Sequence, residues 1–325
     1  MKLKKALVTG GAGFIGSHLC EQLIANGYQV TALDNLFAGS LKNLQNISKN
    51  KNFRFIKGDV RDEKLIDHEV KRHDIVYHLA AIVGVTVVVN NPLENISVNV
   101  EGTKTVAEAC LKHKKKIVFT SSSEVYGKNS KVPLKEEASE SVFGSTKVSR
   151  WAYGLAKALG EHMLFGYQEK GLEFAIVRYF NCFGPRGINP NYANVIPKFI
   201  GQALRNEEIT VHGKGSGTRC FCYVDDTVRG TILAGDNLRN DVVNIGSNKE
   251  ISILKLAQTI IKLTKSDSKI IFIPENKVYT RNYESAQRRV PNIAKAQNLL
   301  GFKRKVNFEN GLKQTVEWTR HQLKK

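Results

Sequence analysis

The sequence predicts an α/β protein built on a doubly wound parallel sheet, with a smaller α/β domain towards the C-terminus. Three observations support this prediction. The 325 residues, 42% of them hydrophobic, are enough for one large or two modest domains. Short β-branched runs alternate with longer helical patterns from residue 3 onward, which is typical of βαβ units. After about residue 180 this alternation loosens and glycine-rich loops follow.

Six strand candidates and the helices between them make up the first part of the chain. The helical stretches are long enough to cross over between parallel strands. We expect strands at residues 6–9, 29–33, 53–57, 75–79, 116–121 and 173–178. The expected helices include residues 17–26, 98–112 and 151–170. A doubly wound parallel sheet is the simplest arrangement of these elements.

The pattern changes after about residue 180. Segments 184–187 and 213–217 indicate loops, and helical periodicity returns at 253–262, at 293–300 and in a last helix from Phe308. We therefore expect one domain at 1–180, to which the chain returns near 220–247. Residues 181–325 would mainly form the smaller domain.

The chain is strongly basic, with 49 basic against 30 acidic residues and a formal net charge of +19. Such a surface attracts anions: a nucleotide, a polyanion, RNA or a membrane face. The N-terminal segment lacks the pattern of a signal peptide and no apolar run is long enough to span a bilayer, so we expect a cytoplasmic protein without a membrane span. The five cysteines are widely spaced without a CxxC pair, which favours structural thiols and no metal site.

A glycine-rich turn follows the first expected strand. Gly10, Gly13 and Gly16 form a GxxGxxG pattern that leads into a helix beginning near Ser17. Glycines here allow a tight turn and let the backbone approach a pyrophosphate at the helix N-terminus. The pattern in this context predicts a Rossmann-type dinucleotide site. Two further contacts to the cofactor are expected from Phe14 and Ile15.

An acid at the end of the second strand indicates which dinucleotide binds. Asp34 lies 24 residues after Gly10, about the spacing of a carboxylate that accepts hydrogen bonds from the adenosine ribose. Asn35 follows it, where an arginine would be needed to hold a 2′-phosphate. The sequence therefore predicts NAD rather than NADP as the cofactor.

A second group of residues predicts catalysis. Tyr153 and Lys157 are spaced i, i+4 on an expected helix, so they lie on one face. A cation beside a phenol stabilises the phenolate, which makes Tyr153 a candidate base. Ser122, Ser123 and Glu124 come just past the end of a parallel strand, where open α/β sheets bind their substrates.

Over nearly its whole length the chain resembles the extended short-chain dehydrogenase/reductase family of nucleotide-sugar epimerases, dehydratases and decarboxylases. Besides the motifs above, the resemblance rests on Gly58-Asp59-Val60, Tyr77-His78-Leu79-Ala80-Ala81, Asn99, Arg178-Tyr179-Phe180-Asn181, Gly184-Pro185-Arg186 and Arg219-Cys220-Phe221. It implies an adenine contact through Asp59 and Val60, and a site for the substrate diphosphate, usually that of a UDP-sugar, at Asn181 and Arg219. The other cofactor contacts that it implies are Leu79, Ala80, Ala81 and Asn99.

The resemblance also implies a chemistry. Tyr153 would remove the proton of the sugar C4 hydroxyl while hydride passes to NAD, Ser122 would hydrogen-bond the same oxygen, and Lys157 would bind the nicotinamide ribose. The resulting 4-keto sugar has three fates: reduction from the other face, loss of water, or loss of a C6 carboxylate as carbon dioxide.

Three features favour decarboxylation. A simple 4-epimerase does not need Glu124, and Ser123 stands where dehydratases tend to carry an aspartate. Residues 288–291 resemble a decarboxylase segment whose arginine, matched here by Arg289, is implied to act near the substrate carboxylate. Arg150-Trp151 resembles the RWxYxxxK arrangement of a decarboxylase domain. We therefore favour decarboxylation of a UDP-glucuronate-type substrate.

Two alternatives stay open. One is a UDP-hexose 4-epimerase acting on UDP-glucose or UDP-N-acetylglucosamine, because residues 82–89, which should border the sugar, depart from the decarboxylase pattern. The other is a non-catalytic regulator that binds NAD or RNA; the basic residues are spread along the chain rather than gathered with aromatic ones, so we expect no nucleic-acid partner. Family members usually pair through two helices, here 98–112 and 151–170, and a homodimer is expected.

Overall fold

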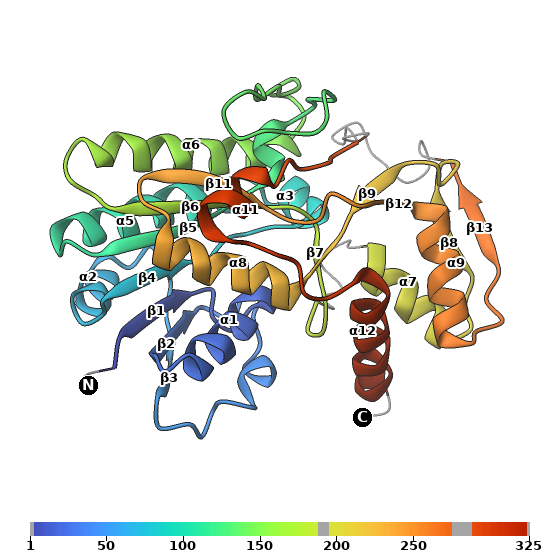
Figure 1. The fold of residues 1–325 in the computed structure, drawn as a ribbon, viewed down its shortest axis with the longest axis horizontal. Helices are drawn as coiled ribbons and strands as arrows, with labels where there is room; N and C mark the ends of the chain where they lie inside the picture. Colours follow the sequence, from blue (N-terminus) through green and yellow to red (C-terminus); the bar gives the residue numbers. More distant parts are fainter. Residues whose placement is uncertain (1–2, 188–194, 275–287, 324–325) are drawn as a thin grey trace.

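The computed structural model describes residues 3–187, 195–274 and 288–323. Its largest element is a parallel sheet of seven strands (Figure 1). From one edge to the other these are β11 (Asp241–Ile245), β6 (Phe174–Tyr179), β5 (Lys116–Ser122), β4 (Ile75–His78), β1 (Lys5–Thr9), β2 (Gln29–Asp34) and β3 (Phe53–Lys57). The chain runs outward from β1 in both directions, so the strand order reverses between β1 and β4. Ligands of doubly wound sheets bind at such a point.

Helices cover both faces of the sheet, as the predicted fold class requires. One face packs against α1 (Phe14–Ala25), α8 (Val224–Asn237) and α11 (Ala294–Leu300), whose buried Leu19, Val228 and Ala296 share one apolar core. The other face packs against α2 (Glu63–Lys71), α5 (Gly102–Lys112) and α6 (Trp151–Gln168), whose buried Ile66, Val106 and Leu164 share a second core. Burial on both sides explains why these strands read as nearly continuous apolar runs.

A smaller part of the molecule, on the right in Figure 1, contains short strands and helices. The strands form three pairs: β8 (Ile209–His212) with β13 (Ile270–Ile273), β9 (Thr218–Cys220) with β12 (Glu250–Ser252), and β7 (Cys182–Phe183) with β10 (Cys222–Tyr223). The helices are α7 (Val195–Leu204), α9 (Ile253–Thr264) and α12 (Phe308–Leu323). The other helical segments among the described residues are α3 (Val85–Asn90), α4 (Pro92–Ile96), η1 (Leu41–Leu44), η2 (Ser97–Glu101) and η3 (Ser123–Tyr126).

All six expected strands are present, and their bounds differ from the prediction by at most one residue. The expected helix at 98–112 is interrupted, because η2 is a π-helical turn that continues into α5. The sequence analysis did not define β11, which follows α8 and pairs in parallel with β6 at the sheet edge. Thus the chain comes back to the main sheet after entering the smaller part.

The short segment around Phe221 separates two cysteines. Cys220 ends β9 and is paired with Glu250, whereas Cys222 begins β10 and is paired with Cys182. The two thiols therefore belong to different strand pairs. Within the described ranges, no group of three or more His, Cys, Asp or Glu side chains could hold a metal ion. Among the helices described, none has the length and hydropathy needed to cross a membrane.

Candidate active site

A cavity of about 2100 Å³ opens where the carboxyl ends of the central strands face the smaller part of the molecule. Its walls come from the glycine turn, from the ends of β2, β4, β5 and β6, and from α6, α7 and β8. This is the edge at which an open α/β sheet binds ligands. The cavity therefore combines the predicted dinucleotide site with the predicted catalytic residues.

The glycine turn is packed too tightly for side chains. A Cβ atom at Gly16 would lie 2.1 Å from the carbonyl oxygen of Gly10. Gly10 itself has φ +70°, and a Cβ there would lie 2.8 Å from the backbone nitrogen of Ala80. Only glycine fits at these two positions. The close packing brings the N-terminus of α1 to the cavity, where its free N–H groups favour an anion.

Asp34 lies at the cavity wall with its carboxylate fixed by backbone donors. The N–H of Ala12 donates to Oδ2 (3.0 Å) and the N–H of Leu36 donates to Oδ1 (2.8 Å). Burial raises the pKa of Asp34, and these backbone hydrogen bonds oppose that shift. A Cβ at Gly39 would come within 2.8 Å of the same carboxylate. Asp34 is thus held rigidly where the sequence predicts the adenosine ribose.

Asn35 and Asp59 are joined at the neighbouring strand ends. The amide of Asn35 donates to Asp59 Oδ2 (3.0 Å), and Arg61 also donates to this carboxylate. The hydrogen bonds from Arg61 lower the pKa of Asp59 to about 2. Asn35 and Val60 line the cavity. Asp59 is not among the described lining residues. Its carboxylate instead accepts hydrogen bonds from Asn35 and Arg61 and so fixes these two side chains.

Lys157 points a buried ammonium group at the same cavity. Its Nζ has no hydrogen-bond acceptor among the described residues, and lies 4.7 Å from the centroid of the Phe119 ring. Burial lowers the pKa of Lys157 to about 7, although Glu161 opposes this shift. A buried donor without an acceptor indicates a ligand that supplies one. A ribose hydroxyl of NAD would do so.

Tyr153 lies one helical turn before Lys157, on the same face of α6, and lines the cavity with it. Opposite them, β5 ends at Ser122, and η3 follows directly. The Oγ atom of Ser122 accepts a hydrogen bond from the N–H of Glu124 (3.2 Å), which caps η3. Ser123 is buried at the cavity wall. The predicted tyrosine, lysine and serines therefore lie around one space.

Glu124 is held between two arginines. Arg289 forms an ion pair with it through Nη1 and donates from Nη2 to Oε2 (3.1 Å), and Nη1 of Arg150 lies 3.3 Å from Oε2. Burial raises the pKa of Glu124, but the positive charges of Arg289 and Arg150 outweigh this and hold it below its ordinary value. Glu124 is therefore an anion at neutral pH, and the three side chains together carry one net positive charge.

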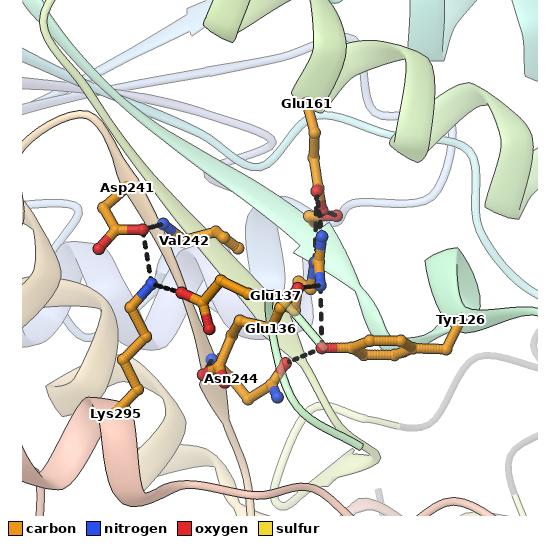
Figure 2. A network of polar contacts seen from close by, with 10 residues as sticks. Tyr126, Glu136, Glu137, Glu161, Asp241, Val242, Asn244 and Lys295 are labelled. Carbon is orange, nitrogen blue, oxygen red and sulfur yellow. Dashed lines mark hydrogen bonds and ion pairs between the residues drawn. The ribbon is translucent and has the colours of Figure 1, made fainter. Parts of the chain in front are cut away.

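A buried polar network fixes these elements relative to one another (Figure 2). Arg178, on β6, donates from Nη2 to Glu161 of α6 (2.6 Å) and from Nη1 to the hydroxyl of Tyr126 (2.9 Å). The Tyr126 hydroxyl in turn donates to Asn244 Oδ1 on β11 (2.9 Å). Tyr126 ends η3, two residues after Glu124. The network thus ties helix α6, which carries Tyr153 and Lys157, to the turn that carries Glu124.

The same network reaches the segment that carries Arg289. Asn244 Nδ2 donates to the carbonyls of Leu134 (3.1 Å) and Asn292 (3.2 Å). Leu134 forms backbone hydrogen bonds with both Val290 (2.7 Å) and Asn292 (2.8 Å). Arg289 is therefore anchored by its own backbone neighbours as well as by its contact with Glu124.

Most of the predicted site residues line the cavity: Gly10, Gly13, Phe14, Ile15, Gly16, Asp34, Asn35, Val60, Leu79, Ala80, Ala81, Ser122, Ser123, Glu124, Tyr153, Lys157, Asn181 and Arg219. Asp59, Asn99 and Arg289 are not among its described lining residues. The side chain of Asn99 is fully buried, accepting from the N–H of Ile82 (3.1 Å) and donating to its carbonyl (3.0 Å). Asn99 therefore fixes the backbone at Ile82, just after β4, without lining the cavity itself.

Several lining residues were absent from the predicted set. Arg150 faces the cavity from the start of α6, and Lys198, His212 and Lys214 line it as well. The Nζ atom of Lys198 lies 3.3 Å from Nε2 of His212. The proximity of Arg150 to Tyr153 in the chain was a usable signal. Lys198 lies in an amphipathic helix of ordinary appearance, and nothing in its local sequence distinguishes it.

Comparisons with known proteins agree with this geometry. Residues 6–246 match the model of the NAD dependent epimerase/dehydratase family. The chain is 43% identical over 318 residues to the UDP-N-acetyl-alpha-D-glucosaminuronate decarboxylase of Bacillus cytotoxicus, covering 98% of each chain. It is 35% identical to UDP-glucuronic acid decarboxylase 1 of Xenopus tropicalis, covering 98% of this chain and 73% of that one.

A solved structure is similar over the same length. The UDP-glucuronic acid 4-epimerase from Bacillus cereus, in complex with UDP-glucuronic acid and NAD, superposes with a TM-score of 0.86 at 31% identity, covering 98% of this chain and 99% of that one. The relatives thus include decarboxylases, and the similar structures include a 4-epimerase solved with NAD.

Proposed function

Because the chain belongs to the NAD-dependent epimerase/dehydratase family, we propose that it is a nucleotide-sugar decarboxylase that removes the C6 carboxylate of a UDP-linked uronic acid through a 4-keto intermediate. The observation that carries the proposal is the position of Glu124 between Arg150 and Arg289, beside Ser122 and the Tyr153 helix. A neutral hexose offers no anion to such a cluster, whereas a uronic acid does.

The first step is oxidation at C4. The glycine turn, Asp34 and Lys157 would hold NAD, which would supply an acceptor for the C4 hydride and, as NADH, the donor that reduces the C4 ketone again. The Tyr153 phenolate takes the proton of the C4 hydroxyl, and Ser122 Oγ hydrogen-bonds the same oxygen. The Lys157 ammonium holds the cofactor ribose and stabilises the phenolate through its charge. The rigid attachment of Asp34 orients the adenosine end.

The second step follows from the electronic structure of the oxidised sugar. A 4-keto uronic acid is a β-keto acid, so the C5–C6 bond can break with its electron pair moving towards the C4 oxygen. Carbon dioxide leaves, and C5 takes a proton that originates from solvent. Ser122 and Tyr153 donate to the C4 oxygen while negative charge develops there. Glu124 and its arginines lie on the side of the departing carboxylate.

Two uronic acids are candidate substrates. The decarboxylase of Bacillus cytotoxicus is named for UDP-N-acetyl-glucosaminuronate, and the one of Xenopus tropicalis for UDP-glucuronate. The described cavity wall formed by Ile82, Val83, Gly84, Val88 and Val89 is aliphatic. Such a wall is compatible with the methyl group of an N-acetylated sugar, so both compounds belong in the test.

Each half of the molecule has a separate proposed task. Residues 1–180, with the return near 220–247, would bind NAD, and residues 181–325 would mainly bind the nucleotide sugar. Asn181 and Arg219, at the cavity wall, would hold the diphosphate. The cysteines are all free thiols, which fits work in a reducing compartment such as the cytoplasm.

A homodimer is also part of the proposal. Leu155 and Leu159 stand on one face of α6 with 41% and 47% of their surface exposed, and Leu93 and Ile96 of α4 are exposed as well. Helices α5 and α6 lie on the same side of the sheet (Figure 1), and α4 packs against α6. Exposed apolar side chains on neighbouring helices favour pairing of two copies. Size-exclusion chromatography with light scattering would test it.

The decisive experiment is to incubate the protein and NAD separately with UDP-glucuronate, UDP-N-acetylglucosaminuronate, UDP-glucose and UDP-N-acetylglucosamine. Products are then read by mass spectrometry and proton NMR. Loss of the mass of carbon dioxide from a uronic acid supports decarboxylation. An unchanged mass with inversion at C4 would make the protein a 4-epimerase and overturn the proposal.

A further inference from the structure

We propose that Glu161 is a positioning residue of the reaction, whose buried carboxylate keeps the Lys157 ammonium charged beside Tyr153. The inference rests on the proposed roles of Lys157, which holds the cofactor ribose, and of Tyr153, which is the base. It assigns a task to an acid outside the predicted site residues.

Glu161 lies on the face of α6 that carries the proposed base and its lysine. It follows Lys157 by four residues, so the two side chains are neighbours on the helix surface. Only 1% of Lys157 and 5% of Glu161 are exposed. Lys157 lines the cavity, whereas Glu161 is not among the described lining residues. Lys157 is therefore the member of this pair that a ligand in the cavity meets.

Arg178 and Ser121 hold Glu161 as an anion. Arg178, on β6, donates from Nη2 to Oε2 (2.6 Å) and from Nε to Oε1 (2.9 Å), and the hydroxyl of Ser121, near the end of β5, also donates to Oε1. Hydrogen bonds of this kind stabilise the ionised carboxylate. A buried acid without such partners would keep its proton instead. The two donors thus secure the negative charge beside Lys157.

Lys157 has no comparable hydrogen-bond partner. Its Nζ lacks an acceptor among the described residues and lies over the ring of Phe119. Burial lowers the pKa of Lys157 to about 7, and the charge of Glu161 opposes this shift. Without that charge two buried cations, Lys157 and Arg178, would remain. Lys157 is the one that would lose its proton, because a guanidinium does not deprotonate in proteins.

Three other ionisable side chains lie close to these groups: His78 on β4, Tyr126 on η3 and Tyr179 on β6. All three are neutral at pH 7. Burial, together with the charge of Lys157, lowers the pKa of His78 to about 3, and burial raises the pKa of Tyr126 and of Tyr179. On η2 and α4, which also pack against α6, the buried polar side chains are asparagines. These groups cannot replace the charge of Glu161.

Glu124 is a further anion at the cavity wall, but it serves a different set of cations. Arg289 and Arg150 form ion pairs with it, and the charge of Arg219 acts on it as well. The pKa of Lys157, in contrast, responds to the charge of Glu161. The two carboxylates therefore have separate tasks, one towards the arginines and one towards the lysine.

The Lys157 ammonium would serve both the cofactor and the base. As a donor it would bind a ribose hydroxyl of NAD, and as a cation it would stabilise the Tyr153 phenolate. A neutral amine forms weaker hydrogen bonds than an ammonium. Loss of the Glu161 charge should therefore weaken cofactor binding at neutral pH, but not at a pH low enough to protonate Lys157 again.

The test measures the affinity of the full-length protein for NADH by fluorescence titration, without sugar, as a function of pH. In wild type the affinity should decline above about pH 7, where Lys157 loses its proton. Glu161→Gln should move this bend in the profile about one pH unit lower and weaken NADH about 10-fold at about pH 7.5, yet match wild type within about 3-fold near pH 5.5. An equal weakening at every pH would show a merely structural role and overturn the inference.

Arg178→Gln should have the opposite sign. Removing the guanidinium leaves Glu161 to Lys157, so the ammonium is stabilised and the bend should move to higher pH. Glu161→Asp keeps the charge and should leave the bend closer to wild type than Glu161→Gln does. Each variant tests the inference without the others, should one of them fail to fold. An unmoved bend in folded Glu161→Gln or Arg178→Gln would overturn it.

Two controls complete the design. Glu169→Gln removes the same charge from the exposed C-terminal end of α6 and should leave the profile unchanged. Lys157→Met should abolish the bend. A bend that persists in Lys157→Met would refute the role of Lys157 and the inference with it. A bend that disappears in Lys157→Met, but does not move when the Glu161 charge is removed, would refute only the task of Glu161. Because no sugar is present, these outcomes are independent of whether the protein releases carbon dioxide.

Discussion

The network in Figure 2 makes a quantitative prediction for Tyr126→Phe. The substitution removes one oxygen atom from a side chain that is 1% exposed. That oxygen accepts from Arg178 Nη1 (2.9 Å) and donates to Asn244 Oδ1 (2.9 Å). Burial raises the pKa of Tyr126, so its hydroxyl stays protonated and serves as a donor throughout the neutral range.

The cost can be worked from these two contacts. A hydrogen bond to a charged group contributes about 1.5–3 kcal/mol, and leaving a buried acceptor without its donor costs about 1–3 kcal/mol. Arg178 Nη1 keeps a second acceptor, the carbonyl of Glu136 at 3.2 Å, which reduces the loss on that side. Phenylalanine fills the same space, so no cavity term is added. We therefore expect a loss of about 2–4 kcal/mol in the free energy of unfolding.

Urea unfolding followed by circular dichroism measures this loss through the midpoint and slope of the transition. The matched control is Tyr167→Phe, whose hydroxyl donates to Glu108 (2.9 Å) at the surface of α6; it should cost less than about 0.5 kcal/mol. Because η3 is anchored through Tyr126, release of carbon dioxide by Tyr126→Phe should also fall, with NAD affinity unchanged. A midpoint equal to that of the control would show that the network does not stabilise the fold as argued.

Three other outcomes follow from the site. Glu124→Gln should reduce release of carbon dioxide at least about 100-fold, yet leave oxidation at C4 detectable as NADH absorbance; an equal loss of both would contradict separate roles. Gly16→Ala should weaken NAD at least about 100-fold, because its Cβ would lie 2.1 Å from the Gly10 carbonyl, whereas Gly166→Ala, with nothing within 4 Å, should leave NAD affinity unchanged in the same titration. Lys157 has a pKa lowered by burial to about 7 in the fold against about 10.4 when unfolded, so the unfolded chain binds more protons between these values. The stability of cofactor-free wild type should therefore rise from pH 7 towards pH 10 relative to Lys157→Met, and parallel pH profiles of the two unfolding midpoints would contradict this.

The sheet was predictable because its physical causes are local. Residues 29–33 and 116–121, for example, are apolar runs that need burial on both faces, and each is followed by a turn or a helix pattern. The glycine turn was equally predictable from the sequence, because the close contact between Gly16 and Gly10 excludes side chains and so requires glycine. In contrast, β11 is a short strand whose place beside β6 depends on a partner 66 residues earlier, Ala175 opposite Asp241. The sequence analysis expects a return of the chain near 220–247, but the residues of β11 alone do not show which strand they pair with.

The candidate site also has one part that the sequence predicts and another part that depends on the assembled fold. Tyr153 and Lys157 are one turn apart on a helix, so their joint orientation follows from the helical period. The contact between Glu124 and Arg289 joins residues 165 apart in the chain. The resemblance to a family implied only that Arg289 acts near the substrate carboxylate, and did not predict this contact. Which arginine faces the cavity could not be predicted at all. The answer depends on where residues 288–292 pass relative to Leu134 and Asn244, which is a property of the assembled core.

Helix α6 suggests how oxidation and the proposed carboxylate loss would share one site. Arg150, Tyr153, Lys157 and Glu161 follow one another at intervals of three or four residues, so they form a single row along α6. Arg150 and Tyr153 are separated by about 4.5 Å along the helix axis. A uronic acid bound with its C4 oxygen at Tyr153 and its C6 towards Glu124 would have that carboxylate within reach of Arg150. The far end of the row, Glu161, is fixed by Arg178 to the sheet and through Tyr126 to the turn that carries Glu124. Because a helix is stiff over this length, the spacing between Arg150 and Tyr153 is fixed. This spacing matches the separation of C6 and C4 that makes the oxidised sugar a β-keto acid.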